Sequence, residues 1–526
     1  MCDGVTSPDD TVRVDVAIVG AGPTGETLAA LLSRCGRSVA LLEAQPTPYV
    51  LPRAIHYDHE VARILAAAGI DETQQAAISE PGSNYDWVNA DRQLLLRFSR
   101  DAIGRAGWPA ANYFSQPQLE ALLRQRNTDD VRVQVLRGWR VTGVVDCDDD
   151  ARVTAYNAAG ASLEVEAAFV IGADGARSFV REHLGFEVVD QGYFFDWLIL
   201  DLIMHTDRVW DPPSLQVCDP RRPVSVVPGG PGRRRFEVML LDGESSETLL
   251  DPLWVWEFLA SWDIGPNDAE LERTAVYRFQ ARWAKAWRSG RVLLAGDAAH
   301  QMPPFAGQGM CSGIRDAANL AWKLDLVLAG FSSIDLLDTY GEERSAHVQN
   351  AIGQSVALGH VICITDPAAA AERDRRMLAE GPDPARALPP IPPPQLRCGV
   401  LHSDRDGVQP MAGILALQGR VRVGGRTGRW DDVVGTGWAL IAREEPKLSE
   451  RDSDLLAGLG THVGWLDGPR AFDDVDGRFT AGLDEQGAAA VVVRPDHYVY
   501  GAIEDLADLP AMLEDLRANL CWIAAT

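Results

Sequence analysis

The sequence lacks the features of disulfide-rich, zinc-binding and membrane-spanning proteins. Its eight cysteines are scattered, and no two have the spacing of a CxxC pair. We therefore expect no disulfide framework and no metal site. No apolar run reaches the length of a membrane span, and the acidic N-terminus, MCDGVTSPDD, is unlike a signal peptide. Scattered thiols suit a reducing compartment, so these absences predict a cytoplasmic protein.

Positive charge is also scarce. Lys and Arg number 49 against 75 Asp and Glu, which gives a net charge of −26. Such a chain repels nucleic acid and anionic membranes, so we expect neither as a partner. The length of 526 residues, of which 46% are apolar, predicts two or three globular domains. The sequence leaves monomer and homodimer equally open.

A glycine-rich turn near the N-terminus has the sequence Gly20-Ala21-Gly22-Pro23-Thr24-Gly25. It follows an apolar run at 14–19, typical of a buried parallel strand, and precedes a stretch that we expect to be helical to about residue 35. In such a GxGxxG turn the first glycine permits the bend, the second lets a pyrophosphate approach the backbone, and the third allows close helix–strand packing. The helix N-terminus then offers free N–H groups to the phosphates.

Glu43 completes this motif. It ends a second predicted strand, at 38–42, and lies 18 residues after Gly25. A carboxylate there can accept hydrogen bonds from the hydroxyls of a ribose. Strand, turn, helix and acid together predict a dinucleotide site, although they do not distinguish FAD from NAD.

Two later segments favour FAD. Residues 172–178 read GADGARS after a predicted strand and contain Asp174. Residues 296–304 read GDAAHQMPP and lead to a predicted helix that begins near Gly309. Asp297 follows a strand, where its carboxylate could hold a ribitol hydroxyl. The positive end of the helix dipole at Gly309 would stabilise the charge of a reduced flavin ring.

The three segments, in this order and spacing, resemble the group A FAD-dependent aromatic hydroxylases, which are single-component flavoprotein monooxygenases. The resemblance is greatest to the hydroxyphenylpropionate hydroxylase branch and its actinobacterial relatives. It covers residues 13–365 well and the rest more loosely. It implies FAD and either NADPH or NADH as cofactors, and a small phenolic or polycyclic aromatic substrate that is hydroxylated with O2 through a flavin C4a-hydroperoxide.

The same resemblance implies roles for individual residues. Glu43 would hold the ribose, Arg53 the pyrophosphate or flavin edge, and Gln118 the ribitol region. The backbone of Met310 and Cys311 would face the flavin pyrimidine, and a redox role for the Cys311 thiol is not expected. The cofactor-binding residues implied in this way are Gly20, Gly22, Pro23, Thr24, Gly25, Glu43, Arg53, Gln118, Val141, Asp174, Asp297, Pro304, Gly309, Met310 and Cys311.

The expected fold is α/β, with a Rossmann-like FAD-binding domain, an inserted and mostly antiparallel substrate sheet, and a C-terminal thioredoxin-like domain without redox cysteines. The expected boundaries are 1–185 with 281–365 for the FAD-binding domain, 186–280 for the substrate sheet, 366–398 for a Pro-rich linker and 399–526 for the C-terminal domain. The sheet is inferred from short alternating runs such as RRRFEVMLL, broken by Pro and Gly.

The substrate wall is expected on the inserted sheet, with Gln216, Phe236, Met239 and Phe305 as candidate substrate-binding residues. In RRRFEVMLL, Phe236 lies on one face of the strand and Glu237 and Met239 lie on the other. No catalytic residue can be named from the sequence. His56 falls early in a predicted helix at 56–69, where a surface role is the simpler expectation.

Two alternatives remain open at this point. The same scaffold could carry out Baeyer–Villiger oxygen insertion or epoxidation, whereas the halogenase motif GWxWxIP is missing. The chain could also be a flavin-binding module that sequesters a ligand without turnover, which the intact GD segment disfavours.

Overall fold

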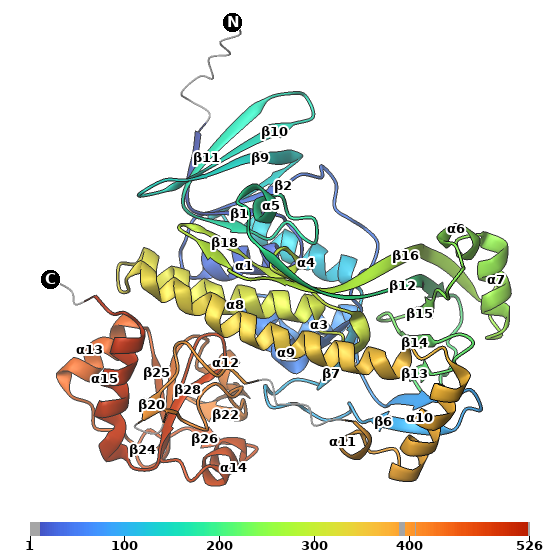
Figure 1. Cartoon of the computed structure of the whole chain (residues 1–526). Helices are drawn as coiled ribbons and strands as arrows, with labels where there is room; N and C mark the ends of the chain where they lie inside the picture. Colours follow the sequence, from blue (N-terminus) through green and yellow to red (C-terminus); the bar gives the residue numbers. More distant parts are fainter. Residues whose placement is uncertain (1–10, 389–394, 405–406, 524–526) are drawn as a thin grey trace, which may run out of the picture.

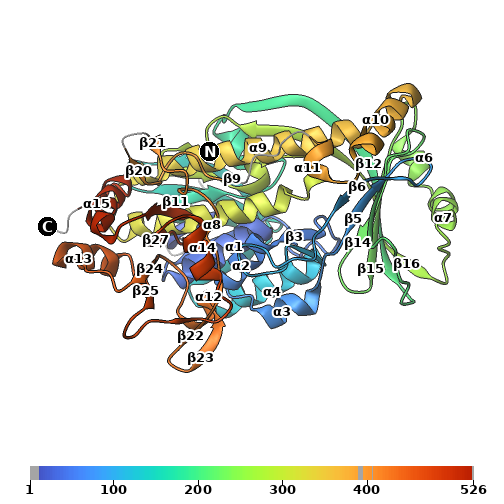
Figure 2. The same cartoon turned by 90° about the horizontal axis from the view of Figure 1, so that it is seen from below.

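The computed structural model describes residues 11–388, 395–404 and 407–523. A Rossmann-like sheet lies at the centre of the molecule, with a second sheet at one end and the C-terminal domain at the other (Figures 1 and 2). The predicted fold class is confirmed in each of these parts.

The first sheet has the order β17-β18-β11-β1-β2-β8 and is parallel from β18 to β8. An antiparallel hairpin, β9 and β10, extends from β11. Helices α1, α4, α8 and α9 pack around this sheet (Figure 1). The strands are β1 (Thr11–Val19), β2 (Val39–Glu43), β8 (Val133–Arg137), β9 (Trp139–Asp146), β10 (Ala151–Asn157), β11 (Ser162–Gly172), β17 (Arg288–Ser289) and β18 (Val292–Leu294). The helices are α1 (Pro23–Arg34), α4 (Gln116–Asp129), α5 (Phe179–His183), α8 (Gly309–Leu328) and α9 (Asp338–Ile362), with η3 (Ile334–Leu337) before α9.

The predicted helix at 56–69 is shorter in the structure. Residues His56–Asp58 form a strand, β3, which pairs with β7 (Ala111–Phe114), and β7 also pairs with β4 (Ser79–Pro81). Helix α2 (His59–Ala67) then begins, because the Asp58 carboxylate accepts hydrogen bonds from the backbone N–H groups of Glu60 and Val61. Helix α3 (Glu72–Ile78) follows. His56 therefore lies on an extended segment and not on a helix surface.

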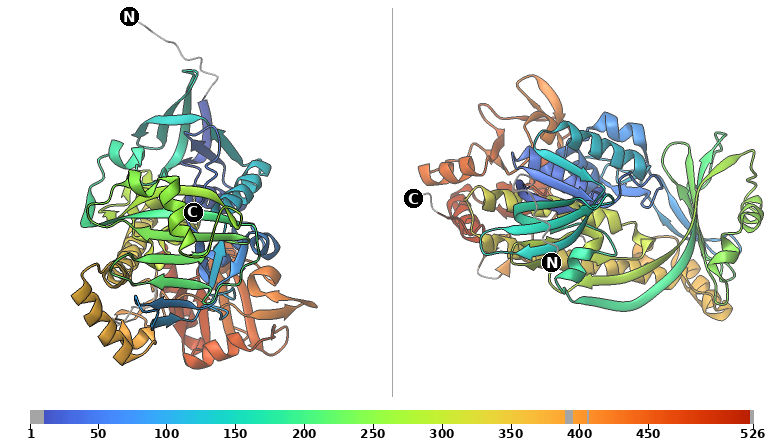
Figure 3. Two further views of the ribbon diagram at one scale, coloured as in Figure 1. Left: turned by 90° about the vertical axis from the view of Figure 1, so that its right-hand side faces the viewer. Right: turned by 90° about the horizontal axis from the view of Figure 1, so that it is seen from above.

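The second sheet has eight strands in the order β19-β16-β12-β15-β14-β13-β5-β6, and most of its neighbours are antiparallel, as predicted (Figure 3). Its last two strands come from the N-terminal region and pair through β5, which is parallel to β13. Residues 1–185 were expected to belong wholly to the FAD-binding domain. Two strands from this segment, β5 and β6, also form part of the substrate sheet. The strands are β5 (Tyr85–Val88), β6 (Leu94–Phe98), β12 (Val188–Met204), β13 (Ser214–Val217), β14 (Val224–Pro228), β15 (Arg233–Met239), β16 (Ala269–Ala284) and β19 (His300–Gln301).

Both faces of this sheet are covered. Helices α6 (Ser246–Leu249) and α7 (Pro252–Ala260) pack on the outer face, where Phe236 and Val238 are buried. Helices α10 (Pro367–Glu380) and α11 (Pro384–Ala387) pack beside β6, and Met377 joins the cluster on the inner face. The stretch predicted as a Pro-rich linker therefore contains packed helices, while 389–394 lie outside the described residues. The domain boundaries themselves stay a prediction.

The C-terminal domain has the thioredoxin-like topology that the sequence predicted. Its sheet has the order β25-β24-β27-β28, with β24 and β25 parallel and the other pairs antiparallel. The elements are β24 (Ala439–Glu444), α13 (Glu450–Gly458), β25 (His462–Asp467), α14 (Arg478–Glu485), β27 (Ala490–Val493), β28 (Val499–Ile503), η4 (Leu506–Asp508) and α15 (Leu509–Asn519). Shorter elements are β20 (Ser403–Asp404), β21 (Gly407–Val408), β22 (Arg420–Val423), β23 (Arg426–Arg429), α12 (Trp430–Val433) and β26 (Asp473–Asp474).

Buried ion pairs join this domain to helices α8 and α9. The Arg494 guanidinium donates to the carboxylates of Glu343 and Asp496, both at 2.6 Å. Asn319, on α8, donates to Asp496 at 2.8 Å, and Lys323 lies 3.0 Å from Glu343. Because these charges are buried, each depends on its partner for compensation. The C-terminal domain thus supplies a second cation, beside Lys323, for the buried Glu343 carboxylate. Among the described residues, no helix is long and apolar enough to cross a membrane.

Candidate active site

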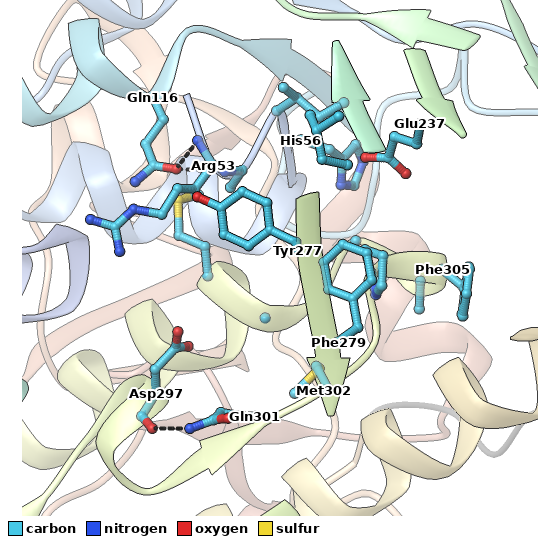
Figure 4. Close-up of a pocket in the computed structure, with 18 of the residues that line it drawn as sticks. Arg53, His56, Gln116, Glu237, Tyr277, Phe279, Asp297, Gln301, Met302 and Phe305 are labelled. Carbon is cyan, nitrogen blue, oxygen red and sulfur yellow. Dashed lines mark hydrogen bonds between the residues drawn. The ribbon is translucent and has the colours of Figure 1, made fainter. Parts of the chain in front are cut away.

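A cavity of about 440 Å³ lies between the first sheet and the inner face of the second. One side is formed by the glycine turn, the GD segment and the N-terminus of α8, and the other by strands β12, β14, β15 and β16 (Figure 4). The lining includes Gly22, Pro23, Thr24, Arg53, His56, Tyr85, Arg100, Tyr113, Gln116, Ile199, Ser225, Glu237, Tyr277, Phe279, Asp297, Met302, Pro304, Phe305, Gly309 and Met310.

The glycine turn is as crowded as the motif requires. A Cβ at Gly20 would lie 2.3 Å from the carbonyl oxygen of Ala173, and one at Gly25 would lie 2.0 Å from that of Gly20. Gly22 has no neighbour within 4 Å of such an atom and opens onto the cavity. Helix α1 begins here without a side-chain cap, so its first N–H groups are free to bind an anion.

Glu43 lies at the end of β2 beside the same turn. Its carboxylate accepts hydrogen bonds from the backbone N–H groups of Ala21, at 3.1 Å, and Gln45, at 2.8 Å. Glu43 does not line the described cavity, which is lined instead by Gly22, Pro23 and Thr24 of the turn. Its proposed contact with a ribose stays a prediction, and its position at the strand end is compatible with it.

The GD segment packs directly on helix α1. Gly296 has a φ of 64°, and a Cβ there would lie 2.6 Å from the Thr24 hydroxyl oxygen. Its N–H donates to the buried Asp316 carboxylate at 2.9 Å, which fixes the short helix η1 (Gly296–Ala298). Asp297 then faces the cavity (Figure 4), where desolvation raises the pKa of this carboxyl above its usual range.

Helix α8 directs its N-terminus into the cavity. It follows the short helix η2 (Pro304–Ala306), and its N-cap, Gln308, makes no side-chain cap hydrogen bond. The backbone at Gly309 and Met310 therefore presents free N–H groups and the positive end of the helix dipole to the cavity.

Cys311, the next residue of α8, is buried and does not line the cavity. Its Sγ lies 3.5 Å from the carbonyl oxygen of Gly307. Burial raises the pKa of its thiol to about 12, so the thiolate needed for redox chemistry is not formed near neutral pH.

Arg53 and its neighbours form the wall opposite Asp297. The Gln116 amide oxygen accepts from the backbone N–H groups of Arg53, at 3.1 Å, and Ala54, at 2.5 Å. Arg235, on the substrate sheet, donates to the Arg53 carbonyl oxygen at 2.6 Å. Gln118 is exposed on α4 and lies outside the cavity lining. The structure thus favours Gln116 over the predicted Gln118, because the first residue of the helix faces the cavity and the third turns away.

Two further predicted residues lie behind the cavity wall. Asp174 accepts from the Ser178 hydroxyl at 2.5 Å and from the Val180 N–H at 3.1 Å, so its carboxylate holds the loop whose backbone at Ala173 lines the cavity. Val141 is buried in the core of the first sheet. Neither side chain reaches the described cavity, and their cofactor contacts stay predictions.

The substrate-wall predictions have mixed outcomes. Phe305 lines the cavity and packs edge-on against Trp197, with ring centroids 5.6 Å apart. Phe236 was wrongly chosen, since it lies on the outer face beneath α7. Met239 lies in the inner-face cluster without lining the cavity. Gln216 is buried behind the wall, where its amide oxygen accepts from the hydroxyls of Ser225 and Tyr85.

Sequence reasoning missed several polar residues of the cavity. Glu237 lines it from β15, and desolvation raises the pKa of this carboxyl above its usual range. The alternation of RRRFEVMLL already placed Glu237 opposite Phe236, so this signal was available. His56 also lines the cavity, although a surface role was expected for it. No local sequence pattern could have placed His56 at the cavity, because the walls of the cavity come from segments that are distant in sequence.

Comparison with known proteins agrees with this geometry. The model of a family described as an FAD binding domain matches residues 13–355, and that of the HcaD C-terminal domain matches 413–519. The chain belongs to the FAD-dependent aromatic hydroxylases. It is therefore an oxidoreductase that uses FAD, NAD(P)H and O2 to hydroxylate an aromatic compound, as the resemblance implied.

Individual relatives span nearly the whole chain. A probable NADH-specific resorcinol 4-hydroxylase of Rhodococcus jostii is 39% identical over 96% of this chain and 95% of its own length. A 3-(3-hydroxy-phenyl)propionate/3-hydroxycinnamic acid hydroxylase of a Mycobacterium species is 33% identical over 94% of this chain and 90% of its own. The flavin-dependent monooxygenase PieE, solved with FAD and substrate, is similar in fold with a TM-score of 0.81, at 22% identity, and covers 98% of this chain and 100% of its own.

The residues present fit FAD. The crowded glycine turn leaves an uncapped helix N-terminus for a pyrophosphate, Asp297 offers a carboxylate to hydroxyl groups, and the N-terminus of α8 offers positive charge to the flavin ring. When bound, FAD supplies the redox chemistry that activates O2. The protein contributes position, charge and exclusion of water.

Proposed function

We propose that this hydroxylase acts on a single-ring phenol with a second hydroxyl group, of which resorcinol is the simplest to test, and that it uses NADH. The cavity carries this proposal. At about 440 Å³ it lies in the lower part of the usual range for ligand sites, and the reactive part of the cofactor shares it with the substrate. A single ring fits that space better than a polycyclic one.

The polar groups of the substrate side support a dihydric ring. Glu237 is a partly buried acid on the inner face of β15, with the Arg235 guanidinium 3.8 Å away. It can accept a hydrogen bond from a substrate hydroxyl, whereas it would repel a substrate carboxylate nearby. Tyr277 and Phe279, on β16, and Phe305 supply apolar surface for the ring itself (Figure 4).

On the cofactor side, the proposed roles follow the geometry. Gly20, Gly22 and Gly25 would admit the pyrophosphate, Glu43 would hold the ribose, Asp297 the ribitol, and the α8 N-terminus the flavin ring. Arg53 and Gln116 would form the wall beside the flavin. The relative from Rhodococcus is described as NADH-specific, which supports NADH as the reductant. We further propose a cytoplasmic location and a monomer or homodimer.

The test is NADH oxidation by the FAD-loaded enzyme with a panel of phenols, with identification of each product. We expect resorcinol to stimulate NADH oxidation with a matching yield of hydroxylated product. 3-(3-Hydroxyphenyl)propionate should be a weaker substrate, and a tetracyclic phenol should give no stimulation. Product formation from the tetracyclic phenol alone would overturn the proposal.

A further inference from the structure

The cavity contains a histidine and an arginine whose polar groups are not used by the protein itself. We propose that His56 and Arg100 together ionise the substrate phenol: His56 accepts the hydroxyl proton, and Arg100 stabilises the phenolate oxygen. This inference rests on the proposed function, since it assigns roles toward a phenol in the same cavity.

His56 is held with its ring at the cavity wall. The ring packs edge-on against Tyr113, with centroids 5.7 Å apart, and its Nδ1 lies next to Gly307. A Cβ at Gly307 would be 3.1 Å from Nδ1, so the glycine allows this close approach. Nδ1 is buried and faces the Gly307 backbone, without a hydrogen bond of ordinary geometry to a described residue. Within the described ranges, no hydrogen bond to protein occupies Nε2 either, which leaves the imidazole available to a ligand.

Charged groups around His56 keep the imidazole neutral. Burial and the nearby Arg100 lower its pKa to about 3, while Asp58 acts in the opposite direction and Arg315 adds to the lowering. A neutral imidazole has one nitrogen lone pair that can accept a proton. The Nδ1–H would point toward the Gly307 backbone, and Nε2 would then be the acceptor.

Arg100 is a cation of the substrate side without a carboxylate partner among the described residues, a property that it shares with Arg273. The Arg100 guanidinium lies over the Tyr85 ring, 5.1 Å from the centroid, and it makes no ion pair with any described residue. Of the other substrate-side arginines, two are paired with carboxylates, and Arg273 is held by a backbone carbonyl and by the Tyr277 ring, 4.5 Å from its centroid. Arg235 donates to the Asp201 carboxylate at 2.6 and 2.9 Å, Arg278 donates to Asp196 at 2.7 Å, and Arg273 donates to the Pro52 carbonyl oxygen.

The chemistry balances without a further reactant. The phenol O–H bond breaks, the proton passes to Nε2 of His56, and the electron pair stays on the oxygen beside Arg100. An opposite charge within about 4–6 Å commonly lowers the pKa of an acid by 1–3 units, more so where water is excluded. The phenolate ring is the better nucleophile at carbon, which hydroxylation requires. Because burial and Arg100 lower the pKa of His56, the imidazole relays the proton to water and does not retain it.

The experiment measures ionisation of a bound phenol directly. The probe is 4-nitrophenol, whose phenolate has its own absorption band, titrated with pH in the FAD-loaded enzyme and displaced by resorcinol to confirm the site. We expect Arg100→Gln to raise the pKa of the bound probe by about one unit, a tenfold change in its ionisation constant. Arg100→Lys should retain most of the effect. The matched control is Arg97→Gln, on strand β6 just before Arg100, whose arginine is paired with Asp86 outside the cavity.

His56 has a separate readout. His56→Asn should lower kcat for resorcinol at least tenfold, with flavin content and the rate of flavin reduction by NADH unchanged.

An unchanged probe pKa in Arg100→Gln would overturn the proposal. So would a rise in KM confined to 3-(3-hydroxyphenyl)propionate, since Arg100 would then bind a carboxylate. If the wild-type enzyme hydroxylates no phenol, the proposed function fails first. If it does and Arg100→Gln ionises the probe normally, only this inference fails.

Discussion

Replacement of Gly25 by alanine should weaken FAD binding strongly, because the added methyl group has no room. Its Cβ would lie 2.0 Å from the Gly20 carbonyl oxygen, whereas ordinary contact begins at 3.4 Å. The neighbour is backbone and cannot rotate away. Either α1 or the turn must therefore move by about 1.4 Å, the difference between those two distances, which displaces the free N–H groups from the pyrophosphate site.

Such overpacking costs about 1–3 kcal/mol. Because 1.4 kcal/mol corresponds to a tenfold change in affinity, the Kd for FAD should rise roughly 5- to 150-fold. The assay is quenching of flavin fluorescence as FAD is titrated into apoprotein, with circular dichroism to confirm the fold.

The matched control is Gly353→Ala, on helix α9, where a Cβ meets nothing within 4 Å. Alanine is the better helix former there by roughly 1 kcal/mol, so this variant should bind FAD normally and unfold at a slightly higher temperature. Normal FAD affinity in Gly25→Ala would refute the reasoning about the turn.

Three further predictions follow from the site and the C-terminal domain. Asp297→Ala should weaken FAD binding by about 1.5–3 kcal/mol and Glu237→Ala much less, because only the first loses a charge-assisted hydrogen bond to the cofactor; equal affinities in a fluorescence titration would remove Asp297 from the site. Arg494→Met should lower the free energy of unfolding by about 3–5 kcal/mol, since Glu343 and Asp496 lose their shared cation, and denaturant titration would show whether stability is retained. In the wild type the pKa of Glu343 is lowered from 4.5 to about 2, so its stabilisation is present above pH 4.5 and is lost as the pH falls toward 2. This decline should be smaller in Arg494→Met, where Glu343 keeps Lys323 but loses Arg494. The C-terminal domain should be inert in thiol redox chemistry, so turnover should survive serine replacement of both of its nearby cysteines, Cys398 and Cys521.

Local patterns predicted the secondary-structure elements that surround the cofactor half of the cavity. The strand, turn, helix and acid from β1 to Glu43 are contiguous in sequence, and their chemistry depends on neighbours a few residues apart. The same is true of the GD segment, where strand β18, Asp297 and helix α8 follow one another. The thioredoxin-like topology of the C-terminal domain was implied by the family resemblance, whereas the residues alone indicated only a separate α/β segment.

Long-range pairing was beyond local patterns. Strands β5 and β6 join the substrate sheet through β13, more than 100 residues away, so the N-terminal segment could not be assigned to that sheet from its own sequence. Phe236 was misassigned because both faces of the sheet are covered, and an apolar residue fits either. Gln118 and Gln116 lie two positions apart on one helix, and only the packing of α4 decides which faces the cavity. His56 and Arg100 both line the cavity because segments distant in sequence pack together there.

The central claim is that the enzyme transfers oxygen from O2 to an aromatic ring, which turnover under isotopically labelled O2 tests most directly. The FAD-loaded protein is supplied with NADH and resorcinol, and the product is analysed by mass spectrometry. We predict a product that carries one labelled oxygen atom, formed in step with NADH oxidation. A product labelled only from water, or turnover that consumes no O2, would contradict the account.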